Sequence, residues 1–269
     1  MACEQCRRRS ALIAAVAHAI TRPSALGLSE EELLRVTKVK DRGGLAGETS
    51  ERVPTALCRH DADYPQVLTQ LDYAPAVLYA TCTVERLREL LTTPAVAIIG
   101  EPAHSHYAHQ ITFALARELA AAGVTVISGL RDGLNAIAHH GALDAEGQTI
   151  AVMPCAPELP YSQADKHLHQ CIMERGAAIS ELPPGFYPPR PWCYEARQRI
   201  IAALADVVVV IEVKGGSQEL LITQFAAELG HEIAVVPGRL TEARGPAVFE
   251  LLRDGAHAVG CAQDVLELI

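Results

Sequence analysis

Glycines at the ends of apolar segments give this chain its clearest chemical signal. Two short apolar runs end at Gly100 and at Ser128-Gly129, an amphipathic stretch separates them, and Gly133 follows just beyond. In a parallel sheet such strand ends lie along one edge, where backbone N–H groups and helix N-termini attract anions. We therefore expect a phosphate site at this edge. Because the glycines do not form GxGxxG within one loop, the pattern is a weak indication of a dinucleotide site.

Basic residues that could also contact phosphate flank a later apolar run of the chain. Arg197-Gln-Arg199 precedes the apolar run IIAALADVVVVIEV, and Lys214-Gly-Gly-Ser217 follows it. A guanidinium group binds phosphate through its planar fork, and an ammonium group binds it as a point charge. These residues are candidate phosphate contacts, although solvated charges beside a helix would give the same pattern.

Residues that could catalyse a reaction do not form a familiar constellation. Ser128 lacks the G-x-S-x-G elbow, and Glu181, Asp206 and Glu212 read equally well as acids at strand ends. Nothing in these residues therefore requires an enzymatic activity.

The eight cysteines are spread over a chain of domain size, which favours reduced thiols over a disulfide framework. Cys3 and Cys6 form a CxxC, and Cys58-x-His60 could add two soft ligands for tetrahedral zinc. A single CxxC without a second pair is a weak zinc signal. The preferred interpretation is that Cys3 and Cys6 lie on the first turn of a helix, with no metal and no cofactor bound.

Composition restricts the class of protein. The chain has 269 residues, of which 49% are hydrophobic and 4% aromatic, which fits buried parallel strands covered by helices. Its formal net charge of −9 gives no overall attraction to nucleic acid or to an anionic membrane, so nucleic-acid binding would need a local basic patch. Neither a membrane span nor a signal peptide is evident, and we expect a cytoplasmic protein.

The order of apolar runs predicts an α/β fold with a doubly wound, mostly parallel, Rossmann-like sheet. Residues 1–50 are expected to form a small helical N-terminal module and linker, and residues 51–269 the main domain, with a connector at 51–92 and a core at 93–269. Strands are expected at 95–100, 124–128, 149–153, 178–181, 206–212 and 232–236, and a last helix at 262–268.

From about Tyr64 to Ile269 the chain resembles the DNA-processing protein A family, also called Smf. The similarity rests on many phrases in the same order: DYPQVLTQLDYAPAVLYA, VAIIG, ALARELAAAGVTVISGL, AIAHHGALDAEGQTIAVMP, ISELPPG, RQRIIAALADVVVVIE, VVPG and LLRDGAHAV. The resemblance implies a Rossmann-like domain that binds single-stranded DNA, forms homodimers, and helps load the RecA recombinase during natural transformation, without catalysis.

Residue by residue, the resemblance implies a phosphate and DNA site at the strand ends. Ser128, Gly129 and Gly133 match the family's SGLxxG loop, and Arg197 and Arg199 match its RNRII phrase. Tyr161 and Ser217 match a YPxxN and an SGS phrase. The candidate site is Gly100, Ser128, Gly129, Arg131, Gly133, Tyr161, Lys166, Arg197, Arg199, Lys214 and Ser217.

Several positions depart from the family's pattern toward acidic residues. Glu101-Pro102 replaces Ser-Arg after the first strand, Asp132 stands where an Arg is usual, and Glu219 replaces a Ser. These carboxylates would weaken phosphate binding, since like charges about 5 Å apart repel by about 1 kcal/mol even in water. An alternative is therefore a divergent paralogue whose pocket senses a nucleotide-derived small ligand. A nucleotide hydrolase and a scaffold without a ligand are further alternatives.

Overall fold

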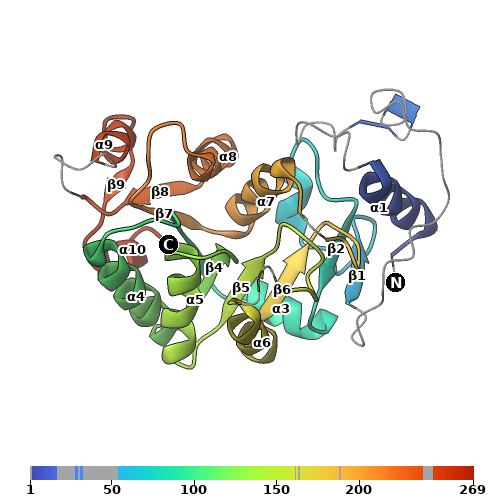
Figure 1. Ribbon diagram of the computed structural model, residues 1–269, viewed down its shortest axis with the longest axis horizontal. Coiled ribbons are helices and arrows are strands. Elements are labelled where there is room, and N and C mark those ends of the chain that lie inside the picture. Colours follow the sequence, from blue (N-terminus) through green and yellow to red (C-terminus); the bar gives the residue numbers. More distant parts are fainter. Residues whose placement is uncertain are drawn as a thin grey trace.

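The computed structural model describes residues 2–16, 28–29, 31–32, 54–160, 162, 164–187, 189–238 and 245–269. The described strands form one nine-stranded sheet in the order β1-β2-β6-β5-β4-β3-β7-β8-β9. All neighbouring pairs from β6 to β9 are parallel, whereas β1 and β2 pair antiparallel with each other and β2 pairs antiparallel with β6. The expected doubly wound, mostly parallel α/β fold is therefore confirmed (Figure 1).

Six of the seven parallel strands lie close to their expected positions, and the short β9 was not expected. The seven strands are β3 (Ala95–Gly100), β4 (Thr125–Gly129), β5 (Thr149–Val152), β6 (Ala177–Ser180), β7 (Val207–Ile211), β8 (Glu232–Val235) and β9 (His257–Ala258). The helices between and after them are α4 (His106–Ala121), α5 (Leu134–Asp144), α6 (Lys166–Arg175), α7 (Pro191–Leu204), α8 (Leu221–Leu229), α9 (Gly245–Arg253) and α10 (Ala262–Leu266), with the 3₁₀ turn η4 (Gln218–Leu220) before α8.

The segment expected as a connector, residues 51–92, contributes more to the sheet than its prolines suggested. It contains β1 (Thr55–Cys58), η3 (Gln66–Gln70), β2 (Val77–Ala80) and α3 (Val84–Thr92), and both strands join the main sheet. Tyr64 fixes the link between them, because its hydroxyl donates to the Pro75 carbonyl at 2.8 Å inside the core. A description of these residues as a connector alone was therefore incomplete.

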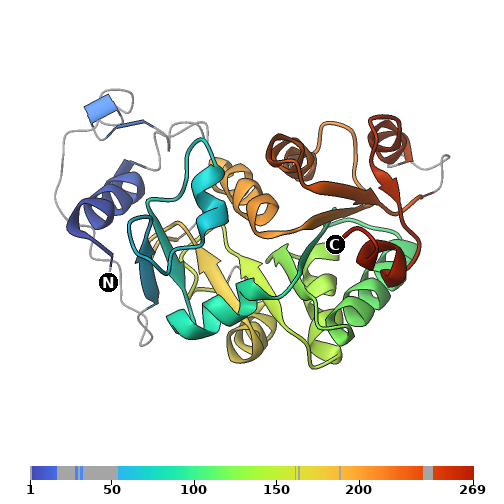
Figure 2. The same cartoon turned by 180° about the vertical axis from the view of Figure 1, so that it is seen from behind.

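Alternate residues of each parallel strand face opposite helical layers, as a buried strand requires. In β3, Val96 and Ile98 belong to the apolar cluster that contains α4, α5 and α10, whereas Ala97 and Ile99 belong to the cluster with η3, α7 and α8. Figure 2 shows the same two layers from behind. Both faces of the sheet are thereby covered, and the ends of the strands are left for ligands.

In the expected N-terminal module the longest described element is the helix α1 (Glu4–Val16). Ile13 packs near Trp192 and Cys193 at the start of α7, and Ser10 shares a hydrogen bond of 3.1 Å with the Tyr79 hydroxyl of β2. The later part of this expected module and linker, residues 33–50, lies outside the described residues. Helix α1 therefore packs against both the sheet and α7.

Candidate nucleic-acid interface at the strand exits

The chain reverses its direction of strand addition between β3 and β7, which are neighbours in the sheet with Gly100 beside Ile211. In open α/β sheets ligands bind at such a switch point, beyond the carboxyl ends of the strands. In this chain the Glu212 carboxylate occupies the position where such a ligand would bind. The Glu212 carboxylate accepts hydrogen bonds from the Ser105 backbone N–H at 2.9 Å and from the Ser105 hydroxyl, at the N-terminus of α4.

The neighbouring strand exit is arranged differently. The loop from Gly129 to Gly133 leads from β4 into α5, and the N-terminus of α5 has no side-chain cap. Gly133 has φ +96°, and a Cβ there would overlap the backbone of Pro102, so only glycine fits. The Leu134 N–H donates to the Glu101 carbonyl at 3.4 Å, but no side chain caps this helix. The remaining N–H groups of the first turn and the helix dipole make this terminus the better anion site of the two.

Arg197 of α7 lies directly against this loop. Its side chain is 2% exposed, and a Cβ on Gly129 would sit 2.5 Å from its Cζ. None of its three guanidinium nitrogens has a hydrogen-bond partner among the described residues. The nearest carboxylate, that of Glu219, is 4.0 Å away from Nη2, which is too long for a hydrogen bond.

Burial lowers the pKa of Arg197, and the nearby Glu219 carboxylate opposes that shift. An arginine keeps its proton in proteins, so the group remains a cation. A buried cation without hydrogen bonds is costly. The guanidinium donors of Arg197 are therefore not used by the described part of the chain and are suited to an anionic ligand.

Tyr194 completes this cluster and was not expected from the sequence. The Cζ atoms of Arg131 and Arg197 lie 5.6 and 5.5 Å from the centre of its ring. Tyr194 is half-buried and stands three residues before Arg197, hence on the same side of α7. That spacing was the available signal, and an aromatic ring beside two arginines suits stacking on a nucleic-acid base. We call Gly129, Arg131, Tyr194 and Arg197 the exit cluster.

Arg199 has a different role from the one expected. It is buried and forms two hydrogen bonds with the Glu181 carboxylate, of 2.6 and 2.7 Å, and its Nε and Nη2 donate to the Tyr73 carbonyl. Two residues along a helix point in directions about 200° apart, so Arg197 and Arg199 cannot serve one site. The expectation that Arg199 contacts phosphate is wrong, because its donors are already used inside the core.

Ser128 is likewise unavailable to a ligand. It is fully buried, and its hydroxyl donates to the Ile98 carbonyl at 2.7 Å, which ties β4 to β3. Gly100 is packed against Leu134 and the Ile211 carbonyl, so its lack of a side chain serves packing. Ser217 caps η4 by accepting a hydrogen bond from the Glu219 N–H. These three residues shape the site without offering it a free side chain.

The remaining candidates are outside the exit cluster. Lys166 is exposed at the start of α6, and Lys214 is exposed after β7, where its backbone N–H donates to the Glu101 carboxylate at 3.3 Å. Tyr161 lies outside the described residues. The two lysines can therefore add positive charge at the rim of the strand exits.

The acidic substitutions are not equivalent either. Glu219 is buried and accepts a hydrogen bond of 2.7 Å from Gln198, and Glu101 accepts one from the Lys214 backbone. Asp132 is exposed and lies near Asp165, whose pKa is raised by burial and also by the Asp132 charge. Asp132 is therefore the carboxylate that most directly opposes a polyanion at the exit cluster.

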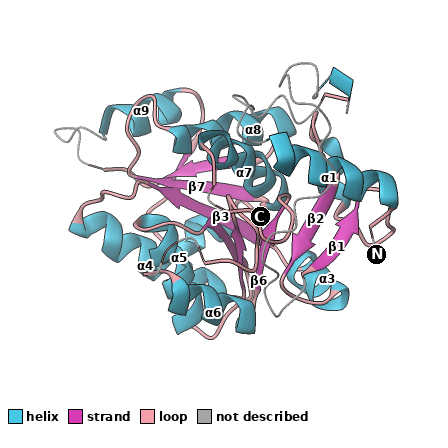
Figure 3. Ribbon diagram, turned by 45° about the vertical axis from the view of Figure 1, so that its right-hand side comes forward, coloured by secondary structure: helices cyan, strands magenta, loops and turns pink. Residues whose placement is uncertain are grey.

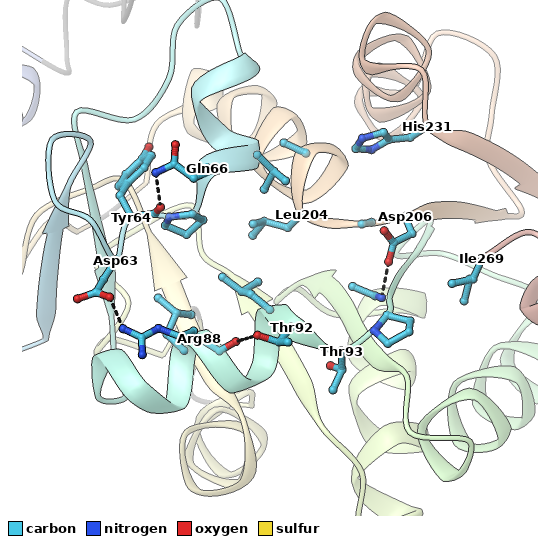
Figure 4. A pocket seen from close by; sticks show the side chains of 18 of the residues that line it. Asp63, Tyr64, Gln66, Arg88, Thr92, Thr93, Leu204, Asp206, His231 and Ile269 are labelled. Atoms are coloured by element: carbon cyan, nitrogen blue, oxygen red, sulfur yellow. Dashed lines mark hydrogen bonds and ion pairs between the residues drawn. The ribbon is translucent and has the colours of Figure 1, made fainter.

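A separate cavity of about 540 Å³ opens at the opposite edge of the sheet, near the amino ends of β3 and β7. Figure 4 shows it between Tyr64, Arg88, Leu204 and His231, with Asp206 bonded to the Ala95 N–H. Its exposed arginine, Arg88, is already paired with Asp63. This edge carries loops that begin strands, so it is not where a doubly wound sheet places its ligand.

The fold and the exit cluster define a Rossmann-like α/β protein with a cationic, aromatic site at the exit of β4. Residues 55–269 match the family model described as DNA recombination-mediator protein A. The chain therefore belongs to that family of DNA-processing proteins.

Individual relatives agree with this assignment. The chain is 34% identical over 197 residues to the putative DNA processing protein DprA of Mycobacterium tuberculosis, which covers 73% of this chain and 50% of the relative. It is 32% identical over 210 residues to DNA processing protein DprA of Streptococcus pneumoniae, covering 77% and 71%. The chain thus spans about half the length of the first of these relatives.

Two solved structures are similar in fold. The structure of DNA processing protein A from Streptococcus pneumoniae superposes with a TM-score of 0.75 at 25% identity, covering 99% of this chain and 93% of that one. A structure that reports the single-stranded DNA binding mode of the Helicobacter pylori protein gives a TM-score of 0.70 at 30% identity, covering 81% and 96%. In the part of the chain that the structure describes, we found no helix long and apolar enough to cross a bilayer.

Proposed function

We propose that this chain binds single-stranded DNA at the exit cluster. A phosphate lies at the N-terminus of α5 within reach of Arg131 and Arg197, and a base stacks on Tyr194. Lys166 and Lys214 attract neighbouring phosphates at the rim. Single-strand binders commonly combine such phosphate contacts with base stacking, and the similar Helicobacter pylori protein has a described single-stranded DNA binding mode.

The observation that carries this proposal is the state of Arg197. Its guanidinium is buried beside Gly129 and has no hydrogen-bond partner among the described residues. Contact with an anion would satisfy these donors, and hydrogen bonds to charged groups are worth about 1.5–3 kcal/mol each. No other described arginine combines this burial with three unpaired nitrogens.

The nucleotide-sensing alternative finds less support. A nucleotide in a Rossmann-like site places its phosphates at the first helix N-terminus of the switch point. In this chain the Glu212 carboxylate already bonds to Ser105 there, and a second anion would be repelled. A thermal-shift screen with nucleotides tests it, since a bound nucleotide would raise Tm.

The direct test is fluorescence anisotropy of a labelled oligothymidylate titrated with the protein over a series of salt concentrations. We expect binding whose log affinity falls linearly with log salt, and we expect Arg131→Ala to make the slope shallower by about 0.7. Tyr194→Ala should weaken binding about 5- to 150-fold, since stacking is worth about 1–3 kcal/mol per base, with little change in slope.

Arg88→Ala is the matched control, because it removes the same charge at the opposite edge of the sheet. If Arg88→Ala weakened binding as much as Arg131→Ala, the DNA would not lie at the exit cluster. Wild-type protein that failed to bind even at low salt would refute the proposed function itself.

We further propose that the protein is a non-catalytic cytoplasmic homodimer that helps load RecA onto single-stranded DNA, as the family resemblance implies. Light scattering of the purified chain tests the dimer. Adding the chain to RecA and to DNA coated with single-strand binding protein should speed filament formation, and Arg131→Ala should reduce that effect in proportion to its loss of DNA binding. If wild type and Arg131→Ala stimulated filament formation equally, RecA loading would not depend on the exit cluster.

A further inference from the structure

Four side chains from two distant parts of the sequence meet at the start of α1. Cys3 and Cys6 come from the N-terminal segment, and Cys58 and His60 come from the end of β1 and the turn after it. Their three sulfur atoms and one ring nitrogen all lie within 4.8 Å of one another. Figure 3 shows α1 beside β1 and β2, which brings these two segments together.

The distances in this cluster fit a common central ion. The Cys3 Sγ and the Cys6 Sγ are each 3.6 Å from His60 Nδ1, and the Cys58 Sγ is 4.0 Å from it. With Zn–S about 2.3 Å and Zn–N about 2.1 Å, sulfur and nitrogen ligands at tetrahedral angles lie about 3.6 Å apart. Three thiols and an imidazole thus already stand at ligand spacing.

Helix geometry and hydrogen bonds of the local backbone position these donors. Cys3 immediately precedes α1 and Cys6 lies in its first turn, so a spacing of three residues puts both on one side of the helix. The turn after β1 is closed by two hydrogen bonds, from the Cys58 N–H to the Asp61 carboxylate and from the Asp61 N–H to the Cys58 carbonyl, both 2.8 Å. Cys6 and Cys58 are buried, which is typical of a structural site.

We propose that Cys3, Cys6, Cys58 and His60 form a tetrahedral structural zinc site. Thiolate and imidazole ligands in this ratio select zinc among the common divalent ions. The sequence favoured unliganded thiols because Cys58 and His60 are distant from the CxxC along the chain, whereas the structure places all four donor atoms within 4.8 Å of one another.

The site would fasten α1 to the edge of the sheet, and α1 continues to α7. Near its other end Ile13 packs in the apolar cluster with Trp192, Cys193 and Ala196. Cys193 directly precedes Tyr194, and Ala196 directly precedes Arg197. Metal binding in small modules supplies folding free energy directly. The expected consequence is that zinc stabilises the N-terminal helix and its contact with the start of α7.

The test is the metal content of the chain purified under reducing conditions without a metal-affinity tag. We expect about one zinc per chain by plasma mass spectrometry, and reconstitution of the apo chain with cobalt should give the thiolate charge-transfer and visible bands of a tetrahedral site. Cys6→Ser and Cys58→Ser should lose most of the zinc, whereas Cys261→Ser, which changes an exposed cysteine elsewhere, should keep it.

Two further readouts keep the proposal testable if a variant folds poorly. Chelation of zinc from the wild-type chain should lower its Tm by about 5 °C or more and make α1 more sensitive to protease, and zinc should reverse both effects. A metal-free wild-type chain that gives no tetrahedral cobalt spectrum would overturn the proposal, as would a disulfide among Cys3, Cys6 and Cys58 in the reduced preparation.

Discussion

The guanidinium of Arg197 lies so close to Gly129 that a Cβ on the glycine would be 2.5 Å from Cζ and 2.8 Å from both terminal nitrogens. The Arg197 guanidinium of α7 thus occupies the volume that a side chain at Gly129, the last residue of β4, would need. This contact explains the glycine at that position, since any larger residue would displace the buried cation. It also means that one methyl group can test the role of Arg197 without removing its charge.

Gly129→Ala should therefore push the guanidinium away from the strand exit. We expect a loss of single-stranded DNA affinity of about tenfold, with destabilisation of about 1–3 kcal/mol from overpacking. Anisotropy and urea unfolding measure the two effects. Gly215→Ala is the control, because a Cβ there meets no atom within 4 Å. Unchanged DNA binding in Gly129→Ala would remove Arg197 from the proposed site.

Arg199→Ala should affect stability and leave the salt dependence of DNA binding intact. Its removal strands the Glu181 carboxylate in the core, and breaking a buried ion pair in this way costs about 3–5 kcal/mol. Arg117→Ala breaks the exposed pair with Asp144 and should cost at most about 1 kcal/mol. Urea unfolding compares the two variants. An equally small loss in both would contradict the structural role assigned to Arg199.

Asp132→Asn should tighten DNA binding about two- to tenfold at low salt, because it removes the exposed carboxylate next to the exit cluster. The gain should shrink as salt is added, since screening weakens the repulsion that is being removed. Asp144→Asn is a matched control at the far end of α5, about 16 Å away along the helix, and should give a smaller gain at low salt and none at 0.1 M salt, where the Debye length is about 10 Å. Weaker binding by Asp132→Asn would show that this carboxylate contacts the ligand favourably.

His139 should make the fold sensitive to acid. Burial lowers its pKa to about 3, whereas an unfolded chain has a histidine pKa of about 6.5. Between these values the unfolded state binds one more proton, so stability falls as the pH is lowered, by up to about 1.4 kcal/mol per pH unit. Its Nδ1 donates to the Thr149 hydroxyl, which in turn donates to the Val126 carbonyl, and this chain suits a neutral ring.

Urea unfolding of wild type and His139→Gln between pH 7.5 and pH 5 measures the contribution of His139 to the pH dependence of the unfolding free energy. The variant is expected to be less stable at pH 7.5 but to lose less stability on acidification. Parallel slopes for wild type and His139→Gln would show that His139 does not take up a proton on unfolding.

The alternation of apolar runs was sufficient to predict the parallel sheet, because strands buried on both faces leave long β-branched segments such as VVVV in β7. It was not sufficient for β1 and β2. Each has only four residues, and prolines and polar residues lie on either side, so neither run has a clear period. Their place in the sheet depends on pairing with β6, which is a contact across about a hundred residues.

The sequence was sufficient to predict that the candidate site lies at the carboxyl ends of the strands, but not which side chains form it. Arg197 and Arg199 carry the same charge in one phrase, yet the direction of each around α7 decides which meets Gly129 and which meets Glu181. Ser128 looked available because it ends a strand, but its side chain points into the sheet and bonds to Ile98. The four possible zinc ligands were visible in the sequence, but the two pairs are more than fifty positions apart, so only the tertiary structure could show that they meet.

The hydrogen bonds from Ser105 to Glu212 have a consequence for how the protein behaves in a cell. Glu212 holds this position from a backbone conformation with φ +37°, which few non-glycine residues adopt. The Glu212 carboxylate thereby occupies the helix N-terminus at the switch point, where related folds bind the phosphates of nucleotides. We expect millimolar ATP to compete poorly for the protein, so that its occupancy tracks the length of exposed polymer and is indifferent to the energy charge of its surroundings.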